Sequence, residues 1–150
     1  MSRNGRRDHH AVVLLWTPYG TPLVKNLSRK PTFWKPPGGK KEGDETPQET
    51  AVREVAEETG IEISGRGLTL LSSTEHERFD SFVFVGVVVD APYWLAAEKN
   101  EEIPQYFSRE SVAELLETEK ILSKYEEPIR RFLDTDMESP LKTRSSWVAG

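Results

Sequence analysis

Cysteine is absent from this chain of 150 residues. The absence excludes disulfide bonds, a thiol nucleophile and a zinc site built on cysteine ligands. A cysteine-free chain is compatible with a reducing compartment, and we expect a cytoplasmic protein.

Long hydrophobic runs are absent as well. Behind a basic N-terminal segment, residues 11–16 form an apolar stretch that is too short for a signal peptide with its cleavage site or for a membrane span. We therefore expect no membrane partner.

Basic residues are in deficit, with 20 Lys and Arg against 25 Asp and Glu and a formal net charge of −5. Nucleic-acid affinity depends on neutralising phosphates, so an acidic protein binds nucleic acid poorly. We expect a small-molecule partner and no stable nucleic-acid partner. A chain of this length is most simply one domain, as a monomer or a homodimer.

The segment 39–61 predicts a glycine loop followed by a short helix. Thr46 and Glu49 have the spacing of a capping box, and Pro47 takes the first helical position. Gly60 suits the left-handed residue that ends many helices. Both ends of the helix are thus specified by local sequence.

One side of this predicted helix is acidic, because Glu54, Glu57 and Glu58 recur at helical spacing opposite an apolar face. Carboxylates three or four residues apart repel each other, which costs stability unless something compensates. Mg²⁺ prefers such oxygen ligands and commonly bridges them to substrate phosphates. Taken alone, the pattern also describes a solvated acidic face.

The whole segment resembles the Nudix box, G-x5-E-x7-R-E-U-x-E-E-x-G-U, where U is aliphatic. Every fixed position is matched, by Gly39, Glu45, Arg53, Glu54, Val55, Glu57, Glu58, Gly60 and Ile61. The chain is therefore identified as a member of the Nudix hydrolase family. That family cleaves the diphosphate of a nucleoside diphosphate joined to another group.

The resemblance implies a catalytic divalent metal, Mg²⁺ with Mn²⁺ as the alternative. The implied ligands are three carboxylates and a glycine carbonyl, from Glu54, Glu57, Glu58 and either Gly38 or Gly39.

Arg53 is implied to orient these carboxylates, and Glu45 to stabilise the loop. The spacing of Arg53 agrees with this role, because it lies four residues from both Glu49 and Glu57.

A general base has to hold a carboxylate within hydrogen-bond reach of the attacking water. The family takes its base from the box helix or from a later loop, so Glu58, Glu98, Glu101 and Glu102 compete. Among the loop residues we favour Glu101, because an acidic pair before a short apolar strand resembles the family's later acidic site.

Substrate contacts are expected from Lys35, Lys40 and Lys41, which lie near the glycine loop, and from Phe79. The ADP-ribose subgroup has a proline downstream of the box, and none occurs between residues 62 and 91. The dinucleoside polyphosphate subgroup tends to have tyrosine near the position of Phe79. Elimination leaves nucleoside triphosphates first and dinucleoside polyphosphates second.

Several other functions stay open. They are hydrolysis of ADP-ribose or nucleotide sugars, removal of pyrophosphate from RNA 5′ ends, and non-catalytic nucleotide binding. Binding modules of this fold normally lose box glutamates, so the intact box favours an enzyme, a pyrophosphohydrolase.

The rest of the chain alternates strands and helices. Residues 11–16 and 23–27 predict a hairpin, residues 61–63 and 68–72 a strand around a glycine turn, residues 81–89 a strand buried on both faces, and residues 103–107 a short strand. Ser108 can cap a helix. A second helical stretch at 121–125 is interrupted by Pro128, where a last turn begins.

The resemblance implies an α/β fold, an α/β/α sandwich around a mixed sheet, and the order of predicted elements agrees with it. We expect a single Nudix domain at 1–133, with a flexible arm at 1–9 and a polar tail at 134–150.

Overall fold

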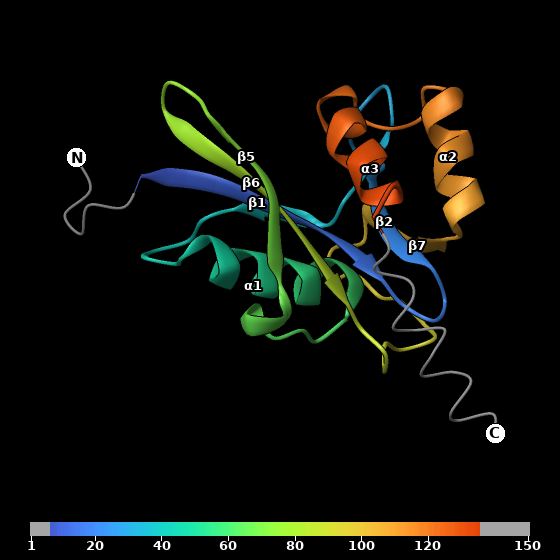
Figure 1. Ribbon diagram of the computed structural model, residues 1–150, viewed down its shortest axis with the longest axis horizontal. Coiled ribbons are helices and arrows are strands. Elements are labelled where there is room, and N and C mark those ends of the chain that lie inside the picture. The colour runs from blue at the N-terminus through green and yellow to red at the C-terminus, as the bar shows by residue number, and fades with distance from the viewer. Residues whose placement is uncertain (1–6, 136–150) are drawn as a thin grey trace.

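Two β-sheets with helices packed outside them form the fold in the computed structural model, which describes residues 7–135 (Figure 1). The strands are β1 (Asp8–Trp16), β2 (Thr21–Asn26), β3 (Trp34–Lys35), β4 (Gly38–Lys40), β5 (Thr69–Glu75), β6 (Phe79–Val87) and β7 (Glu102–Phe107). The helices are α1 (Pro47–Thr59), η1 (Gly65–Gly67), α2 (Arg109–Glu117), η2 (Ser123–Tyr125) and α3 (Glu126–Leu133).

The larger sheet is mixed and has the order β4-β1-β6-β5, in which β1 and β6 are parallel and the other pairs are antiparallel. The smaller sheet is antiparallel, with β2 between β3 and β7. The predicted α/β class with a mixed sheet is confirmed.

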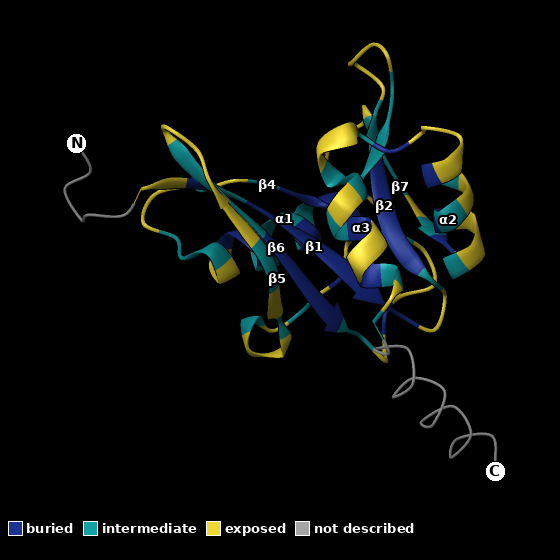
Figure 2. Cartoon of the chain, turned by 45° about the horizontal axis from the view of Figure 1, so that its top comes forward, coloured by how far each residue is buried: buried dark blue, intermediate teal, exposed yellow. Residues whose placement is uncertain are grey.

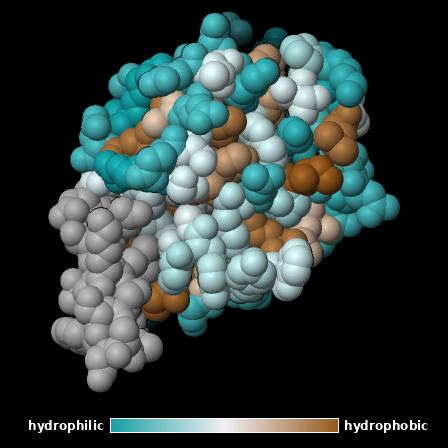
Figure 3. All heavy atoms as spheres, turned by 90° about the vertical axis from the view of Figure 1, so that its right-hand side faces the viewer, coloured by the Kyte–Doolittle hydropathy of each residue, from teal (hydrophilic) through white to brown (hydrophobic). Residues whose placement is uncertain are grey.

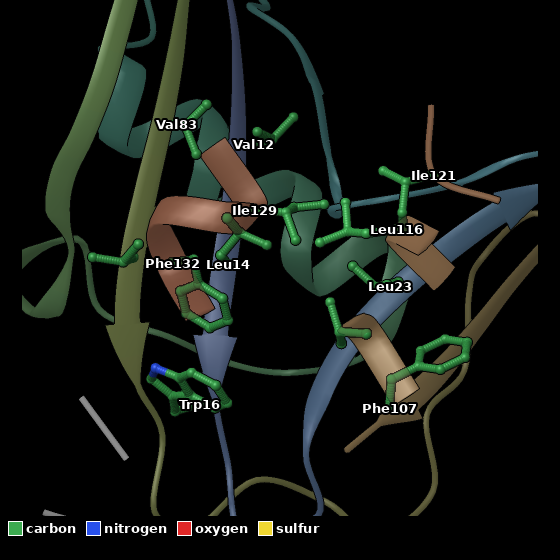
Figure 4. Packing of buried hydrophobic residues seen from close by; sticks show 12 residues of the cluster. Val12, Leu14, Trp16, Leu23, Val83, Phe107, Leu116, Ile121, Ile129 and Phe132 are labelled. Carbon is green, nitrogen blue, oxygen red and sulfur yellow. The ribbon is translucent and has the colours of Figure 1, made fainter. Parts of the chain in front are cut away.

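The two faces of β1 pack into different cores. One face packs against α1, where Val13 and Val55 belong to the same buried cluster. The other face packs against α3 and the smaller sheet, and there Trp16 stacks on Phe132 with 4.3 Å between ring centroids (Figure 4). Alternation along an extended strand sends successive side chains to opposite faces, so β1 needs a helical layer on each side.

The middle of strand β6 is buried on both faces, as its apolar sequence predicted, but the strand spans Phe79–Val87 instead of 81–89, and Val89 is exposed. Val83 and Val85 join the cluster on the α3 side, whereas Phe84 joins the cluster on the α1 side. Figure 2 shows β1 and β2 as buried strands while the outer surfaces of α2 and α3 are exposed.

The predicted hairpin of the first two strands is wrong. The turn exists, since Thr17 and Gly20 exchange backbone hydrogen bonds of 3.1 Å in each direction. However, β1 and β2 lie in different sheets. Both edges of β1 are already paired, with β4 and β6, so β2 can only pair elsewhere.

Three smaller expectations also differ from the structure. Residues 61–63 form no strand, and β5 begins at Thr69. Ile121 forms a β-bridge with Trp34 instead of a helical turn. Helix α3 begins two residues before Pro128. That proline is compatible with the first turn, because N–H groups there have no acceptor within the helix.

The chain ends need one correction. β1 begins at Asp8, and His9 is 4% exposed, so residues 8 and 9 belong to the sheet and not to an arm. Residues 1–6 and 136–150 lie outside the described part, and with them most of the expected arm and tail.

Within residues 7–135, no helix is both long and apolar enough to cross a membrane. The face in Figure 3 carries separate hydrophobic patches among hydrophilic ones. The exposed aromatic residues Tyr93 and Trp94, 67% and 82% exposed, lie in the loop before β7.

Candidate active site

The glycine loop lies directly against the acidic helix. In the β1–β4 pairing, Gly38 is opposite Val12 and Gly39 is opposite Ala11. A Cβ atom at Gly39 would collide with the carboxylate of Glu54. A side chain at residue 39 would therefore have to displace the Glu54 carboxylate, and glycine leaves that carboxylate beside the loop.

The ends of α1 are formed as the sequence predicted. The Thr46 hydroxyl accepts a hydrogen bond from the backbone N–H of Glu49 at 3.1 Å, and the Glu49 carboxylate accepts one from the backbone N–H of Thr46 at 2.8 Å. Gly60 ends the helix in the left-handed conformation, with φ of 84°. The capping box sets the residue at which the helix begins, and the start of the helix in turn determines which glutamates face the loop.

Arg53 binds several box glutamates at once. Its Nε lies 2.6 Å from Oε2 of Glu45, and its Nη1 lies 3.2 Å from Oε2 of Glu54 and 3.2 Å from Oε1 of Glu57. Its Nη2 donates a hydrogen bond of 2.8 Å to the carbonyl oxygen of Lys40. One guanidinium thus joins the loop to two of the three carboxylates of the acidic face, those of Glu54 and Glu57.

This network changes the pKa values of its members. The hydrogen bond from Arg53 lowers the pKa of Glu45 to about 2, and the same bond raises the pKa of Arg53. Of the two helical partners that spacing allowed for Arg53, Glu57 is contacted, whereas Glu49 is committed to the capping box. Glu45 and Arg53 are a charged pair throughout the physiological pH range.

Glu58 points into the protein, and its side chain is 8% exposed. Its Oε1 accepts a hydrogen bond of 2.9 Å from the backbone N–H of Gly38 and lies 3.8 Å from Nζ of Lys35. Burial raises the pKa of Glu58 to about 8, the neighbouring Glu102 raises it as well, and Lys35 and the Gly38 N–H oppose the rise. Without a divalent cation, this carboxyl group is largely protonated at neutral pH.

The box carboxylates are not yet arranged around one point. Within the described residues, no three acidic or histidine side chains form a ready metal-binding group. Nη1 of Arg53 contacts both Glu54 and Glu57, while Glu58 binds Gly38. Burial raises the pKa of Glu54, Arg53 opposes that rise, and the charge of Glu57 adds to it.

The donor set nevertheless fits a hard divalent cation. All available ligand atoms are oxygens, from carboxylates and loop carbonyls, which is the chemistry that Mg²⁺ and Mn²⁺ select. The close approach of Gly39 to Glu54 brings backbone and carboxylate donors to one place. The residues that could hold the metal are the predicted ones, Gly38, Gly39, Glu54, Glu57 and Glu58.

The later acidic loop reaches the end of α1. The backbone N–H of Glu98 donates a hydrogen bond of 2.8 Å to the carbonyl oxygen of Glu57. Glu98 and Glu101 are exposed. Glu102 begins β7, and its side chain interacts with Glu58. The structure thus brings Glu102, the neighbour of the favoured Glu101, into contact with a box carboxylate.

The three lysines predicted to bind phosphate lie at two different places beside the loop. Nζ of Lys35 lies 3.1 Å from the carbonyl oxygen of Pro36 and 3.4 Å from that of Gly38, next to the glycine loop. Lys40 and Lys41 line a cavity of about 370 Å³ beside the loop. The other residues around this cavity are Asp8, His9, His10, Arg78 and Phe79.

Phe79 lines that cavity, but both faces of its ring are covered. His10 stacks on one side at 4.6 Å between centroids and His76 stacks at 4.5 Å. A nucleobase could stack on Phe79 only by displacing a histidine. Phe79 can therefore offer substrate its edge, not a free face.

His9 is the residue that sequence reasoning missed. The sequence placed it in an arm and gave it no role, yet it is buried and its Nε2 lies 2.7 Å from Oγ1 of Thr50 on α1. The alternation of the following strand was the available signal, because it places His9 on the same face as Ala11 and Val13, toward α1.

These features define a mixed α/β protein in which a glycine loop and a glutamate-rich helix gather oxygen donors around one arginine. The NUDIX domain family matches residues 5–135, and the chain belongs to this family. The family membership predicted from the box is confirmed.

Curated relatives resemble parts of the chain. It is 34% identical over 79 residues to a dihydroneopterin triphosphate diphosphatase of Haemophilus influenzae, covering 51% of this chain and 49% of that protein. It is 44% identical over 45 residues to an 8-oxo-dGTP diphosphatase of Proteus vulgaris, covering 30% and 38%. It is 38% identical over 69 residues to a mouse diphosphoinositol polyphosphate phosphohydrolase 3-alpha, covering 45% and 42%. The matches span about half the length of these relatives or less.

Solved structures share the fold. A MutT protein from Bacillus halodurans superposes with a TM-score of 0.65 at 20% identity, over 86% of this chain and 84% of the other. A NUDIX-family hydrolase from Clostridium perfringens superposes with a TM-score of 0.63 at 19% identity, over 86% and 97%.

Proposed function

We propose that this protein is a metal-dependent pyrophosphohydrolase that cleaves the diphosphate linkage of a nucleotide substrate in the cytoplasm. The observation that carries the proposal is the position of the Glu54 carboxylate, which lies where a side chain on Gly39 would be and is held, with Glu57, by Arg53. A binding module of this fold would not need the complete set of glutamates. The named activities of the curated relatives, all on phosphoric anhydrides, support the same reaction class.

Bound Mg²⁺ or Mn²⁺ would supply charge neutralisation at the phosphates and an activated water. The protein residues do the remaining work. Arg53 keeps Glu54 and Glu57 oriented, and Lys35 adds a positive charge beside Glu58. Substrate phosphates then meet cations on two sides, because Lys40 and Lys41 line the adjacent cavity.

The base that deprotonates the water is a loop glutamate in this proposal, Glu101 as the sequence favours. Glu102 is the competing residue, because its side chain interacts with Glu58. Glu101→Gln and Glu102→Gln variants should be compared at saturating metal. The base variant should lose about 10² to 10⁴ in kcat, whereas the other should stay near wild type.

The substrate is a nucleoside triphosphate or a dinucleoside polyphosphate. Lys35, Lys40 and Lys41 lie around the loop, where they can hold phosphates on either side of the cleaved bond. Two of the matched relatives are named for triphosphate substrates, which supports this choice over ADP-ribose, nucleotide sugars and RNA 5′ ends.

A diphosphoinositol polyphosphate is the second candidate. The cavity beside the loop has Lys40, Lys41 and Arg78 against a single acid, Asp8, and Phe79 has no free face for a base. A densely phosphorylated substrate would suit these charges, and the mouse relative is named for one.

A substrate panel with Mg²⁺ tests the proposal, with nucleoside triphosphates, dinucleoside polyphosphates, ADP-ribose, nucleotide sugars, triphosphorylated RNA and a diphosphoinositol polyphosphate. We expect the highest kcat/KM for a nucleotide with three or more phosphates. Glu57→Gln should abolish turnover and keep the circular dichroism spectrum, because glutamine retains the shape but removes ligand charge. Undiminished turnover in Glu57→Gln would refute the metal assignment, and no turnover of any substrate by metal-bound wild type would favour a binding module.

A further inference from the structure

A chain of short hydrogen bonds connects β1 to the arginine of the metal-binding helix. Nε2 of His9 lies 2.7 Å from Oγ1 of Thr50, and that hydroxyl donates a bond of 2.9 Å to Oε1 of Glu45. Glu45 in turn binds Arg53, through Nε at 2.6 Å and Nη2 at 3.1 Å. The motif residues Glu45 and Arg53 are thus connected by hydrogen bonds to two residues outside the fixed positions of the box.

The direction of these bonds follows from the charge of Glu45. Its pKa is lowered to about 2, so the carboxylate is ionised and can only accept. Thr50 must therefore donate its single hydroxyl proton to Glu45. The same hydroxyl then accepts from His9, which requires a proton on Nε2 of the imidazole.

Burial makes this chain of bonds rigid. Thr50 is 0% exposed and His9 is 4% exposed, so neither has much access to water as an alternative partner. The ring of His9 also packs edge-on against Phe82, with 5.9 Å between centroids. A buried polar group left without a partner costs about 1–3 kcal/mol, which favours the hydrogen bond between His9 and Thr50.

These hydrogen bonds affect the orientation of the proposed metal-binding carboxylates through Arg53. Glu45 holds the Nε and Nη2 atoms of Arg53, which leaves Nη1 directed at Glu54 and Glu57, 3.2 Å from each. We propose that Thr50 and His9 are positioning residues for the metal-binding carboxylates: they fix Glu45, and through it the arginine that spaces the two helix glutamates. The inference rests on the proposed metal site but not on the identity of the substrate.

Thr50→Val and Thr50→Ser test the proposal. Valine keeps the shape of threonine and removes the hydroxyl, whereas serine keeps the hydroxyl. Thr59→Val is the matched control, since Thr59 is also fully buried on α1 and its hydroxyl also makes two hydrogen bonds, to Val55 and from Ile61, away from Glu45. It should lower stability like Thr50→Val and leave the measurements below unchanged.

Two measurements need no turnover. The first is the Mn²⁺ dissociation constant, from electron paramagnetic resonance. The second is the exchange rate of the Arg53 Nε–H proton in the metal-free protein, from ¹⁵N NMR, which reports directly on the bond to Glu45. Loss of a residue that orients a metal ligand typically weakens metal binding about 10-fold or more. We expect such a change, with faster Nε–H exchange, in Thr50→Val but not in Thr50→Ser or Thr59→Val.

A second pair of variants keeps the test independent of the folding of Thr50→Val. His9→Gln can still donate to Thr50 from its amide, whereas His9→Phe keeps the contact with Phe82 and cannot. Mn²⁺ binding should weaken in His9→Phe and recover in His9→Gln. Wild-type Mn²⁺ affinity and Arg53 exchange in Thr50→Val and His9→Phe would overturn the proposal. A failure of the proposed function would look different: tight metal binding without hydrolysis of any substrate in wild type.

Discussion

Glu58 should make the metal-free protein less stable as pH rises. Its side chain is 8% exposed, and burial with the help of Glu102 raises its pKa from 4.5 to about 8, against the opposing effects of Lys35 and the Gly38 N–H. A carboxyl group with a higher pKa in the folded state binds its proton more tightly there than in the unfolded chain. Its contribution is fully present below about pH 4.5 and is lost as pH rises through about 8.

The magnitude follows from the size of the shift. Each pKa unit corresponds to about 1.4 kcal/mol, so a rise from 4.5 to about 8 amounts to roughly 3–5 kcal/mol of unfolding free energy between the two limits. The neighbouring Glu102 adds to the raised pKa of Glu58, so the loss depends on both carboxyl groups. Glu58→Gln removes the buried ionisable group, while the amide carbonyl can still accept the hydrogen bond from the Gly38 N–H.

Urea unfolding in EDTA between about pH 5 and pH 9 measures the effect. The unfolding free energy of Glu58→Gln minus that of wild type should be near zero at the acid end and rise by about 3–5 kcal/mol at the alkaline end. Glu117→Gln, at an exposed site on α2, is the control and should stay within about 0.5 kcal/mol. Excess Mg²⁺ should stabilise wild type at high pH, because the proposed metal ligand is the ionised carboxylate. A difference that does not change with pH would refute the reasoning.

Two further substitutions test the loop and the core. Gly39→Ala should weaken Mn²⁺ binding about 10-fold or more, because the new Cβ collides with the Glu54 carboxylate. The control Gly67→Ala, at a site with open space around it, should bind Mn²⁺ like wild type. Equal Mn²⁺ affinities of the two variants would contradict the loop geometry. Phe132→Ala should lower the unfolding free energy by about 3–5 kcal/mol, because Phe132 is 0% exposed and stacks on Trp16. Urea denaturation measures this change. A loss below about 1 kcal/mol would mean that the helix repacks around the smaller side chain.

The sequence predicted correctly those helices and strands whose bounds or burial are determined by residues within the element itself. α1 runs between its predicted capping box and Gly60, and the middle of β6 is buried on both faces as its composition indicated. The pairing of β2 was not predictable in this way. The sequence of the turn at Thr17 to Gly20 does not show whether the strands on either side of it pair with each other. Their pairing is prevented by β4 and β6, which occupy both edges of β1.

Within the candidate site too, contacts along one helix were predictable from the sequence, whereas contacts that depend on strand pairing were not. The box names Arg53 and its glutamates, because their spacing on one helix fixes which side chains can meet. Glu102 depends instead on strand register: β7 pairs with β2 so that Glu102 is opposite Asn26. Glu101 precedes the strand and is exposed, whereas Glu102 is the first residue of the strand and is half-buried. Sequence places an acidic pair before β7, and only the register between two distant strands decides which member of that pair reaches Glu58.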